Sequence, residues 1–294
     1  MKLVESSNFC SLKLHVSSKF LLLAVIFLGC GKANEIPAYL DIQPFTLQVN
    51  SSEGTGRHRI VDAWVFAGDE NLGIFELPAT IPVLGTGSKK ISIFPGIRQN
   101  GIKSSTFIYP MFTKDTTTLN LVPNQTFLLR PRTKYDRTAQ FLYIEDFENP
   151  AHSMRFNEDL SGKTGFVSVL GGVEGRSGKL TLRRSDTTVA ARKASSFRIT
   201  LPAQYESFFL EFDHRSDVDF GVGILAYEDP TDKYVPFVKS IMFPRTDWTR
   251  TYINLTNEAR TLKTRDFRVY FSTVLSDSLQ TGDVWIDNLK ILVK

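Results

Sequence analysis

Two carboxylates spaced two residues apart are the most direct candidates for chemistry in this chain. Glu211 and Asp213 lie in the strand-like segment 208–213, and a third acid, Asp217, follows the apparent loop 214–216. Alternate residues of a strand point to the same face, so one carboxyl could act as an acid and the other as a nucleophile on a glycosidic bond. Two interpretations stay open, a cryptic glycoside-active enzyme and a solvated strand face.

The other residues with catalytic potential do not complete a motif. The acids are similar to the Glu-x-Asp-x-x-Glu strand of laminarinase-like glycosidases, but the last acid is an Asp at a longer spacing. Residues 161–164 end like a P-loop, yet Asn157 stands where that motif needs glycine. His58, His152 and His214 are too far apart in the sequence for a zinc-ligand pair. We therefore predict that the protein is not an enzyme.

The segments that would position these residues are strands. Phe is abundant, with 23 residues, and short alternating runs such as 60–66 and 90–94 are separated by Gly, Pro, Asn and Asp. No long segment has the 3.6-residue periodicity of a helix. Turn dipeptides such as Asn100-Gly101 supply the positive φ that tight turns require. The pattern predicts an all-β protein, with a polar boundary between two domains at 133–138.

The first predicted domain covers residues 36–135 and is expected to be an Ig-like β-sandwich. Its features follow in a fixed order: a turn over 65–69, then Leu72-Gly73, a Pro-containing strand end over 77–82, and a strand over 85–93. In this order they resemble a PEGA-like or carboxypeptidase-regulatory-like domain. The resemblance implies a spacer or an interaction unit.

The second predicted domain covers residues 139–294 and is expected to be a jelly-roll β-sandwich. It opens with Asp146-Phe147-Glu148, contains a strand around Trp248, and ends with the strand-like segment 282–291. These features resemble a galactose-binding-like jelly roll, the fold of many carbohydrate-binding modules. The resemblance implies a surface that binds a glycan or an envelope partner.

The same resemblance implies a structural calcium ion that joins the first strand of the jelly roll to the last. Asp146, Glu148 and Asp287 stand at the matching strand ends. Calcium takes six to eight oxygen ligands, including carboxylates and backbone carbonyls. The alternative is that these acids lie at strand ends in solvent.

Three aromatic residues are the candidates for stacking on a sugar ring. Tyr227 and Tyr234 border the turn-like segment 228–232, so we expect both to be exposed there. Trp248 is the third candidate, although large aromatic residues in strands are usually buried in the core.

The N-terminal segment predicts where the protein is located. Residues 20–29 form an uncharged apolar run that is too short to span a bilayer, and it is typical of a secretory signal. Cys30 follows at once, and the run with its cysteine resembles the lipobox of bacterial lipoproteins. The resemblance implies removal of residues 1–29, diacylation of Cys30, and a tether over 30–35. A plain signal peptide with a coincidental cysteine is the alternative.

The charge of the chain and the residue after Cys30 indicate which partner is excluded and which membrane is expected. Removing residues 1–29, which carry three Lys and one Glu, lowers the formal net charge from +4 to about +2. No basic cluster is present, which argues against a nucleic-acid partner. No Asp follows Cys30, so we expect the outer membrane, with the protein facing the periplasm or the cell surface.

Together these patterns predict a non-catalytic envelope lipoprotein of the Bacteroidetes type, anchored to a membrane by the lipid on Cys30. Its jelly roll would bind a glycan or an envelope protein. The alternative is a structural or accessory subunit of a cell-surface assembly that binds no small ligand.

Overall fold

The computed structural model describes residues 35–158, 164–228, 232–262 and 265–294. The predicted lipidation site, Cys30, lies outside these residues. Within them the regular structure is almost entirely β-strand, with one short helix, α2 (Thr256–Thr261), and the single 3-10 turn η1 (Ser51–Glu53). The prediction of an all-β protein is confirmed. In the described part of the chain, no helix has the length and apolar character needed to cross a membrane.

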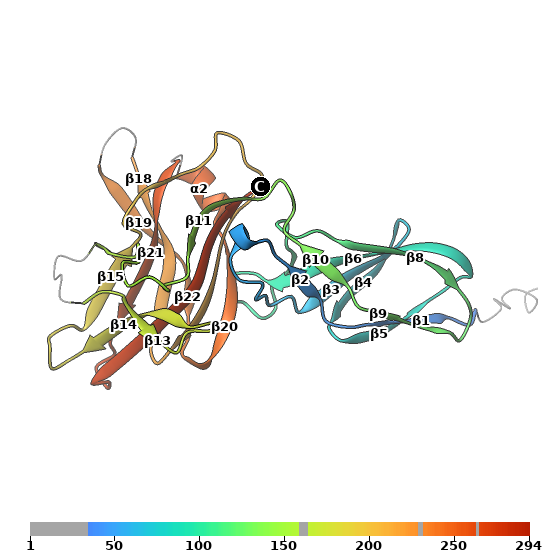
Figure 1. Ribbon diagram of the computed structural model, residues 1–294, viewed down its shortest axis with the longest axis horizontal. Helices are drawn as coiled ribbons and strands as arrows, with labels where there is room; N and C mark the ends of the chain where they lie inside the picture. Colours follow the sequence, from blue (N-terminus) through green and yellow to red (C-terminus); the bar gives the residue numbers. More distant parts are fainter. Residues whose placement is uncertain (1–34, 159–163, 229–231, 263–264) are drawn as a thin grey trace, which may run out of the picture.

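The strands form two lobes, which lie end to end in Figure 1. The strands of the N-terminal lobe are β1 (Ala38–Ile42), β2 (Thr46–Gln48), β3 (Asp62–Ala67), β4 (Glu70–Glu76), β5 (Ala79–Val83), β6 (Gly87–Arg98), β7 (Thr106–Ile108), β8 (Asp115–Leu121), β9 (Thr126–Leu129) and β10 (Arg132–Lys134). The strand orders of its sheets are β5-β1-β9, β10-β2 and β4-β3-β6-β7, with β8 beside β6.

Alternating burial explains the core of this lobe. In β1 the side chains of Ala38, Leu40 and Ile42 are buried, while the residues between them are partly exposed. The same core contains Ile91 and Ile93 of β6, which belongs to a different sheet. The lobe is therefore held together by apolar side chains that its sheets turn toward one another.

The C-terminal lobe is a jelly-roll sandwich of two sheets. Its strands are β11 (Gln140–Glu145), β12 (Phe156–Asn157), β13 (Val167–Leu170), β14 (Arg176–Arg183), β15 (Ala190–Ala194), β16 (Ile199–Thr200), β17 (Phe208–Ser216), β18 (Phe220–Tyr227), β19 (Tyr234–Met242), β20 (Arg245–Asn254), β21 (Asp266–Val274) and β22 (Thr281–Val293). One sheet has the order β13-β14-β22-β17-β20, with β11 beside β22, and the other has the order β12-β15-β21-β18-β19, with β16 beside β21. The main apolar core lies between these sheets.

Strand β17 shows how this sandwich positions polar groups. Leu210 and Phe212 belong to the core between the two sheets. Glu211 and Asp213 alternate with them and point to the outer face of the sheet. The N-terminal lobe covers this part of the outer face, so the acids of β17 lie between the lobes.

The contact between the lobes is continuous with the core of the N-terminal lobe. Phe209 of β17, Tyr252 of β20 and Leu292 of β22 all belong to that core. The ring of Tyr109 lies 5.0 Å from the ring of Phe209 and 4.9 Å from that of Tyr252. Aromatic packing of this kind stabilises a contact beyond its buried area, so the two lobes share one apolar interface.

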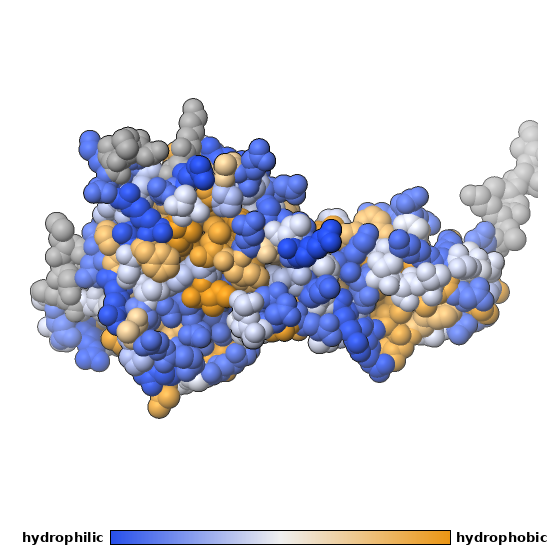
Figure 2. Space-filling view, turned by 45° about the horizontal axis from the view of Figure 1, so that its top comes forward, coloured by the Kyte–Doolittle hydropathy of each residue, from blue (hydrophilic) through white to orange (hydrophobic). Residues whose placement is uncertain are grey.

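The space-filling view shows how the remaining apolar residues are distributed. Separate hydrophobic patches lie on both lobes, with hydrophilic surface between them (Figure 2). Several exposed apolar residues belong to β19 or follow it directly, namely Val235, Val238, Ile241 and Phe243. Strand β19 is an edge of its sheet.

Candidate functional site

The acid pair of β17 forms a buried ion network between the lobes. Glu211 and Asp213 are fully buried, and Arg250 of β20 pairs with both (Nη2 to Glu211 Oε2 2.6 Å, Nη1 to Asp213 Oδ2 3.0 Å). The hydroxyls of Tyr109 and Tyr135 donate to Glu211 at 2.6 and 2.8 Å. The predicted solvated strand face is therefore wrong. The two acids do not face each other across a cleft either, because side chains of the N-terminal lobe cover them.

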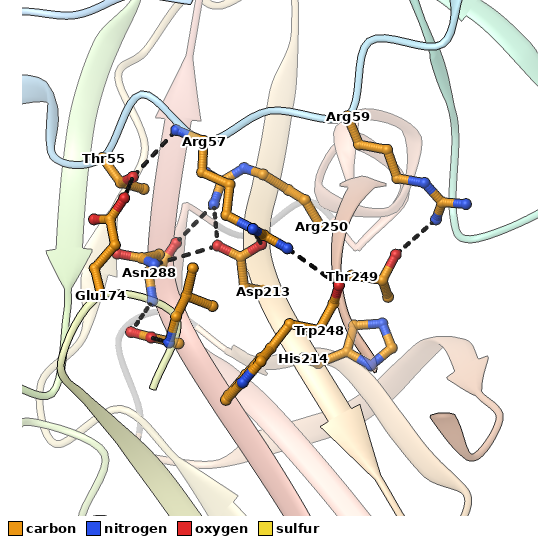
Figure 3. A network of polar contacts seen from close by, with 12 residues as sticks. Thr55, Arg57, Arg59, Glu174, Asp213, His214, Trp248, Thr249, Arg250 and Asn288 are labelled. Carbon is orange, nitrogen blue, oxygen red and sulfur yellow. Dashed lines mark hydrogen bonds and ion pairs between the residues drawn. The ribbon is translucent and has the colours of Figure 1, made fainter. Parts of the chain in front are cut away.

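A segment of the N-terminal lobe completes this network (Figure 3). Arg57 donates from Nε to Asp213 Oδ1 at 2.9 Å, and Asn288 donates to Asp213 Oδ2 at 3.3 Å. Lys290 donates to the backbone oxygen of Thr55 at 2.7 Å. Each buried charge thus has an opposite charge or a hydrogen-bond partner, which the low dielectric of an interior requires.

The electrostatics of Glu211 follow from these partners. Burial by itself would raise the pKa of its carboxyl. Arg250, Lys290 and the hydroxyl of Tyr109 outweigh burial and hold the pKa of Glu211 below its ordinary value. The carboxylate therefore stays ionised, which suits a structural ion pair and not a general acid.

A cavity of about 860 Å³ lies beside this network, where the lobes meet. Its walls come from β17, from β20, from the end of β19 with the connection to β20, and from the N-terminal lobe. The lining residues are Arg59, Asn100, Gly101, Ile102, His214, Ser216, Asp217, Ser240, Ile241, Met242, Phe243, Pro244, Arg245, Thr246, Asp247, Thr249 and Thr251. This volume lies in the range of small-molecule binding sites.

Two buried side chains of the cavity wall have unsatisfied polar atoms. His214 and Ser216 are each 2% exposed. Within the described residues, neither Nδ1 of His214 nor Oγ of Ser216 has a hydrogen-bond partner. Buried polar atoms without partners are rare and cost about 1–3 kcal/mol each. Both residues border the cavity.

The charge state of His214 is fixed by its surroundings. Burial, followed by the positive charges of Arg245 and Arg59, lowers the pKa of this imidazole to about 3. His214 is therefore neutral at physiological pH. Its Nε2 lies 3.1 Å from the hydroxyl of Thr251, so the opposite ring nitrogen, Nδ1, is the one without a partner among the described residues.

Tight turn chemistry attaches the N-terminal lobe to the cavity wall. Asn100 and Gly101 have φ of 58° and 73°, which confirms the turn predicted from this dipeptide. The amide of Asn100 donates to the backbone oxygen of Tyr252 at 2.8 Å, and its side-chain oxygen accepts from the amide of Asn254 at 2.9 Å. The turn thus fixes Gly101 and Ile102 at the edge of β20.

Part of the rim of the cavity is apolar and exposed. Phe243 is 70% exposed, and Ile241 and Ile102 are also exposed. These side chains border the same cavity as the polar groups of β17 and β20. The site therefore combines a partly apolar rim with a polar interior.

The structure places the predicted sugar-stacking tyrosines elsewhere. Tyr227 of β18 is buried, so its predicted exposure is wrong. The Arg198 guanidinium lies 3.7 Å from the centre of the Tyr227 ring, and Arg268 donates to the Tyr227 hydroxyl at 2.8 Å. Tyr234, its partner in β19, is half-buried, with its ring centre 5.3 Å from that of Tyr227.

Trp248 belongs to the other sheet of the sandwich and does not join the two tyrosines. It is half-buried on the outer face of β20. The guanidinium of Arg215 lies 5.2 Å from its ring centre and 4.6 Å from that of Trp285, while the Lys179 ammonium lies 4.9 Å from the Trp285 ring. These contacts are cation–π interactions, so the three predicted aromatics do not form one binding surface.

The three acids of the predicted calcium site border one small cavity of about 260 Å³. Among the residues described, however, no group of three or more His, Cys, Asp or Glu is arranged to hold a metal ion. Instead, Asp146 accepts from the amide of Glu148 at 3.1 Å, and Glu148 accepts from that of Arg176 at 2.7 Å. Asp287 accepts from the amide of Val173 at 2.8 Å. Asp287 thus binds the loop between β13 and β14, Glu148 binds the first residue of β14, and Asp146 stabilises its own turn.

Asp287 gives the first testable prediction. Burial raises the pKa of this carboxyl to about 7 from 3.8. The folded state then binds more protons than the unfolded state in this window, so stability from this group is present below about pH 4 and is lost as the pH rises to about 7. The slope is at most about 1.4 kcal/mol per pH unit.

Urea unfolding of the wild type and of Asp287→Asn between pH 4 and 8 measures this effect. The variant should lack the downward slope that Asp287 contributes. Parallel pH profiles for the two proteins would contradict the assignment.

Several residues of the cavity could not be identified as site residues from the sequence. Strand β17 continues through Ser216, so the predicted loop 214–216 is wrong. The polar run from His214 to Asp217 hides the strand, because four consecutive polar residues interrupt the alternation of apolar and polar side chains. Nothing in the sequence connects Arg59 or Phe243 with this site, since the fold brings them in from distant segments.

Comparisons with known proteins find similarity in structure only. No protein-family model and no curated protein matches the chain. A family 30 carbohydrate-binding module from a cellulosomal cellulase of Clostridium thermocellum is 16% identical, with a TM-score of 0.38 over 52% of this chain and 96% of the module. A family 29 module complexed with cellulohexaose is 12% identical, with a TM-score of 0.30 over 53% of this chain and 93% of the module. A family 61 module in complex with β-1,4-galactotriose is 10% identical, with a TM-score of 0.30 over 46% of this chain and 85% of the module.

Proposed function

We propose that this protein is a non-catalytic glycan-binding protein whose ligand occupies the cavity between the two lobes. The observation that carries the proposal is the pair of buried, unpartnered polar atoms on His214 and Ser216, in a cavity of about 860 Å³ bordered by the exposed ring of Phe243. A sugar has hydroxyl groups that could pair with the polar atoms and an apolar C–H face that could stack on the ring of Phe243.

The polar groups of the cavity suit hydroxyl recognition. The hydroxyls of Ser216 and Thr249 can each donate and accept. The neutral imidazole of His214 has Nδ1 left for a ligand, since its Nε2 is paired with Thr251. Thr249 already accepts from the Arg59 guanidinium at 2.9 Å. Such fixed groups give a ligand orientation and specificity, while apolar contacts supply affinity.

The non-catalytic part of the proposal rests on where the carboxylates lie. Glu211 and Asp213 are held by Arg250 and have no access to a ligand. Asp217 and Asp247 border the cavity but are exposed to water at its rim. A catalytic carboxylic acid depends on a shielded environment to hold its proton.

The proposal includes anchoring to the outer membrane through a lipid on Cys30. The described chain enters β1 at the end of the N-terminal lobe that is far from the C-terminal lobe (Figure 1). An anchor there would place the N-terminal lobe next to the membrane as a spacer and the ligand cavity farther out. Incorporation of labelled palmitate into the full-length chain tests the anchor.

A second candidate function is supported by the exposed apolar residues of β19. Val235, Val238 and Ile241 lie on an edge strand, and unpaired edges with apolar side chains can pair with another chain. An accessory subunit of a surface assembly would use such an edge.

A glycan array with the full chain after Cys30 tests the proposed function. The C-terminal lobe alone is unsuitable, because Arg59 and the turn at Asn100 belong to the N-terminal lobe. The proposal predicts binding to a defined glycan, whereas a folded protein that binds none would contradict it and favour the accessory role.

The variant Phe243→Ala tests the role of the exposed ring in glycan binding. Removing the exposed ring should weaken glycan binding about tenfold, because aromatic stacking contributes about 0.5–1.5 kcal/mol beyond area burial. Isothermal titration with the tightest glycan from the array measures the change. The control is Leu170→Ala, which removes another exposed apolar side chain (78% exposed) away from the cavity. Equal affinities for the two variants would exclude Phe243 from the site.

A further inference from the structure

Two arginines of the cavity lie in an unusual electrostatic setting. Arg59 comes from the segment before β3, and Arg245 is the first residue of β20. In the parts of the chain that the structure describes, neither guanidinium forms an ion pair with a carboxylate. Arg98, which is close by, differs from them because it pairs with Asp62.

The unpaired arginines are close enough to affect one another. Burial, and then the charge of Arg245, lowers the pKa of Arg59. Burial, and then the charges of Arg245 and Arg59, lowers the pKa of His214. A like charge disfavours the charged form of its neighbour, and an anion between the two guanidiniums would relieve this repulsion.

The acids at the rim do not cancel this positive charge. Asp217 and Asp247 border the cavity and are exposed, as Arg245 is, so water and salt screen all three charges, and the half-buried Arg59 is screened least. The charges that act on His214 are those of Arg245 and Arg59, and no carboxylate contributes. The charged side chains that act on the buried wall of the cavity at His214 are therefore both positive.

We infer that the cavity selects an acidic sugar, one that carries a carboxylate or a sulfate group, with Arg59 and Arg245 binding the anion. This inference rests on the proposed glycan-binding function and specifies its substrate class. The free Oγ of Ser216 and the unpartnered nitrogen of His214 would complete the anion site as neutral donors, because charge-assisted hydrogen bonds are the strong ones. Phe243 would contact the apolar face of the ring.

Binding of matched oligosaccharides to the full chain after Cys30 tests this inference. The ligands are an oligouronate, the neutral oligosaccharide of the same linkage and length, its sulfated form, and inorganic sulfate alone. We expect at least a tenfold preference for an acidic sugar over the neutral one, since a hydrogen bond to a charged group contributes about 1.5–3 kcal/mol. The uronate and sulfated arms show which anion is recognised.

Arg245→Gln should reduce the preference to about twofold or less, and Arg245→Glu should reverse it. Arg245 is exposed, so both variants should fold, which circular dichroism checks. The control is Arg183→Gln, which removes another exposed arginine, outside the cavity, and should keep the preference.

The outcomes separate the two proposals. Equal binding of neutral and acidic sugars would overturn the inference and leave the glycan-binding function in place. Displacement of the acidic sugar by inorganic sulfate at the same concentration would also overturn it, because the site would then recognise an anion alone. Absence of binding to every sugar would overturn both.

Discussion

Replacing Arg250 with methionine is expected to lower the free energy of unfolding by about 3–5 kcal/mol. The variant leaves Glu211 and Asp213 without their shared cation in a place where both are fully buried. Methionine fills much of the space, so the loss comes from uncompensated charge and not from a cavity. Urea unfolding of the full chain after Cys30 at pH 7 measures the change.

Neutralising the acids separates charge from packing. The triple variant Arg250→Met, Glu211→Gln, Asp213→Asn should recover most of the lost stability, because a buried ion pair often exchanges for neutral groups at little net cost. Each amide keeps an oxygen that can accept from Tyr109 or Arg57. Arg183→Met, an exposed change, should stay within about 0.5 kcal/mol of the wild type. A loss below about 1 kcal/mol in Arg250→Met would mean that the network is not a closed, dry interface.

Thr246→Trp is expected to abolish glycan binding, with a loss of at least a hundredfold in affinity. Thr246 is exposed and borders the cavity, so an indole at this position occupies the space that the ligand needs. A hundredfold loss in affinity corresponds to about 2.8 kcal/mol of binding free energy. A ligand whose sugar ring is displaced from its polar contacts would lose more than this. Titration with the tightest glycan from the array measures the affinity.

The control for this variant is Thr80→Trp, on an exposed position of β5 in the N-terminal lobe. It adds the same indole to the surface without entering the cavity, and it should bind like the wild type. Retained affinity in Thr246→Trp would place the ligand elsewhere on the molecule, and the exposed edge at β19 would then be the next surface to test.

The fold class could be predicted from the sequence because it depends on local patterns. Alternating runs such as the one in β6 form strands wherever one face is buried. The Asn100-Gly101 turn followed from backbone sterics alone, since both residues adopt positive φ. These features need no knowledge of which segments meet in space.

The roles of individual residues could not be predicted, because distant segments decide them. Glu211 and Asp213 occupy outward positions of a strand, which are usually solvated. Here Arg57, Tyr109 and Tyr135 of the N-terminal lobe contact them. The alternation was predicted correctly, whereas the covering lobe left no signal in the strand itself.

The same reason explains the error at Tyr227. A residue that borders a turn is usually exposed, but Arg198 and Arg268 reach it from other strands and connections. The cavity is an assembly of this kind as well. Arg59, Asn100, His214 and Phe243 are separated by long stretches of sequence, and only Asn100 belongs to a recognisable motif, the Asn-Gly turn.

The most direct test of the account is the imidazole NMR signal of His214 during titration of the full chain after Cys30 with its tightest glycan. The His214 signals are expected to shift and to saturate with the dissociation constant measured by calorimetry. The signals of His58 and His152, which do not border the cavity or contact His214, should stay nearly unchanged. Glycan binding that leaves the His214 signals in place would contradict the assignment of the ligand to this cavity.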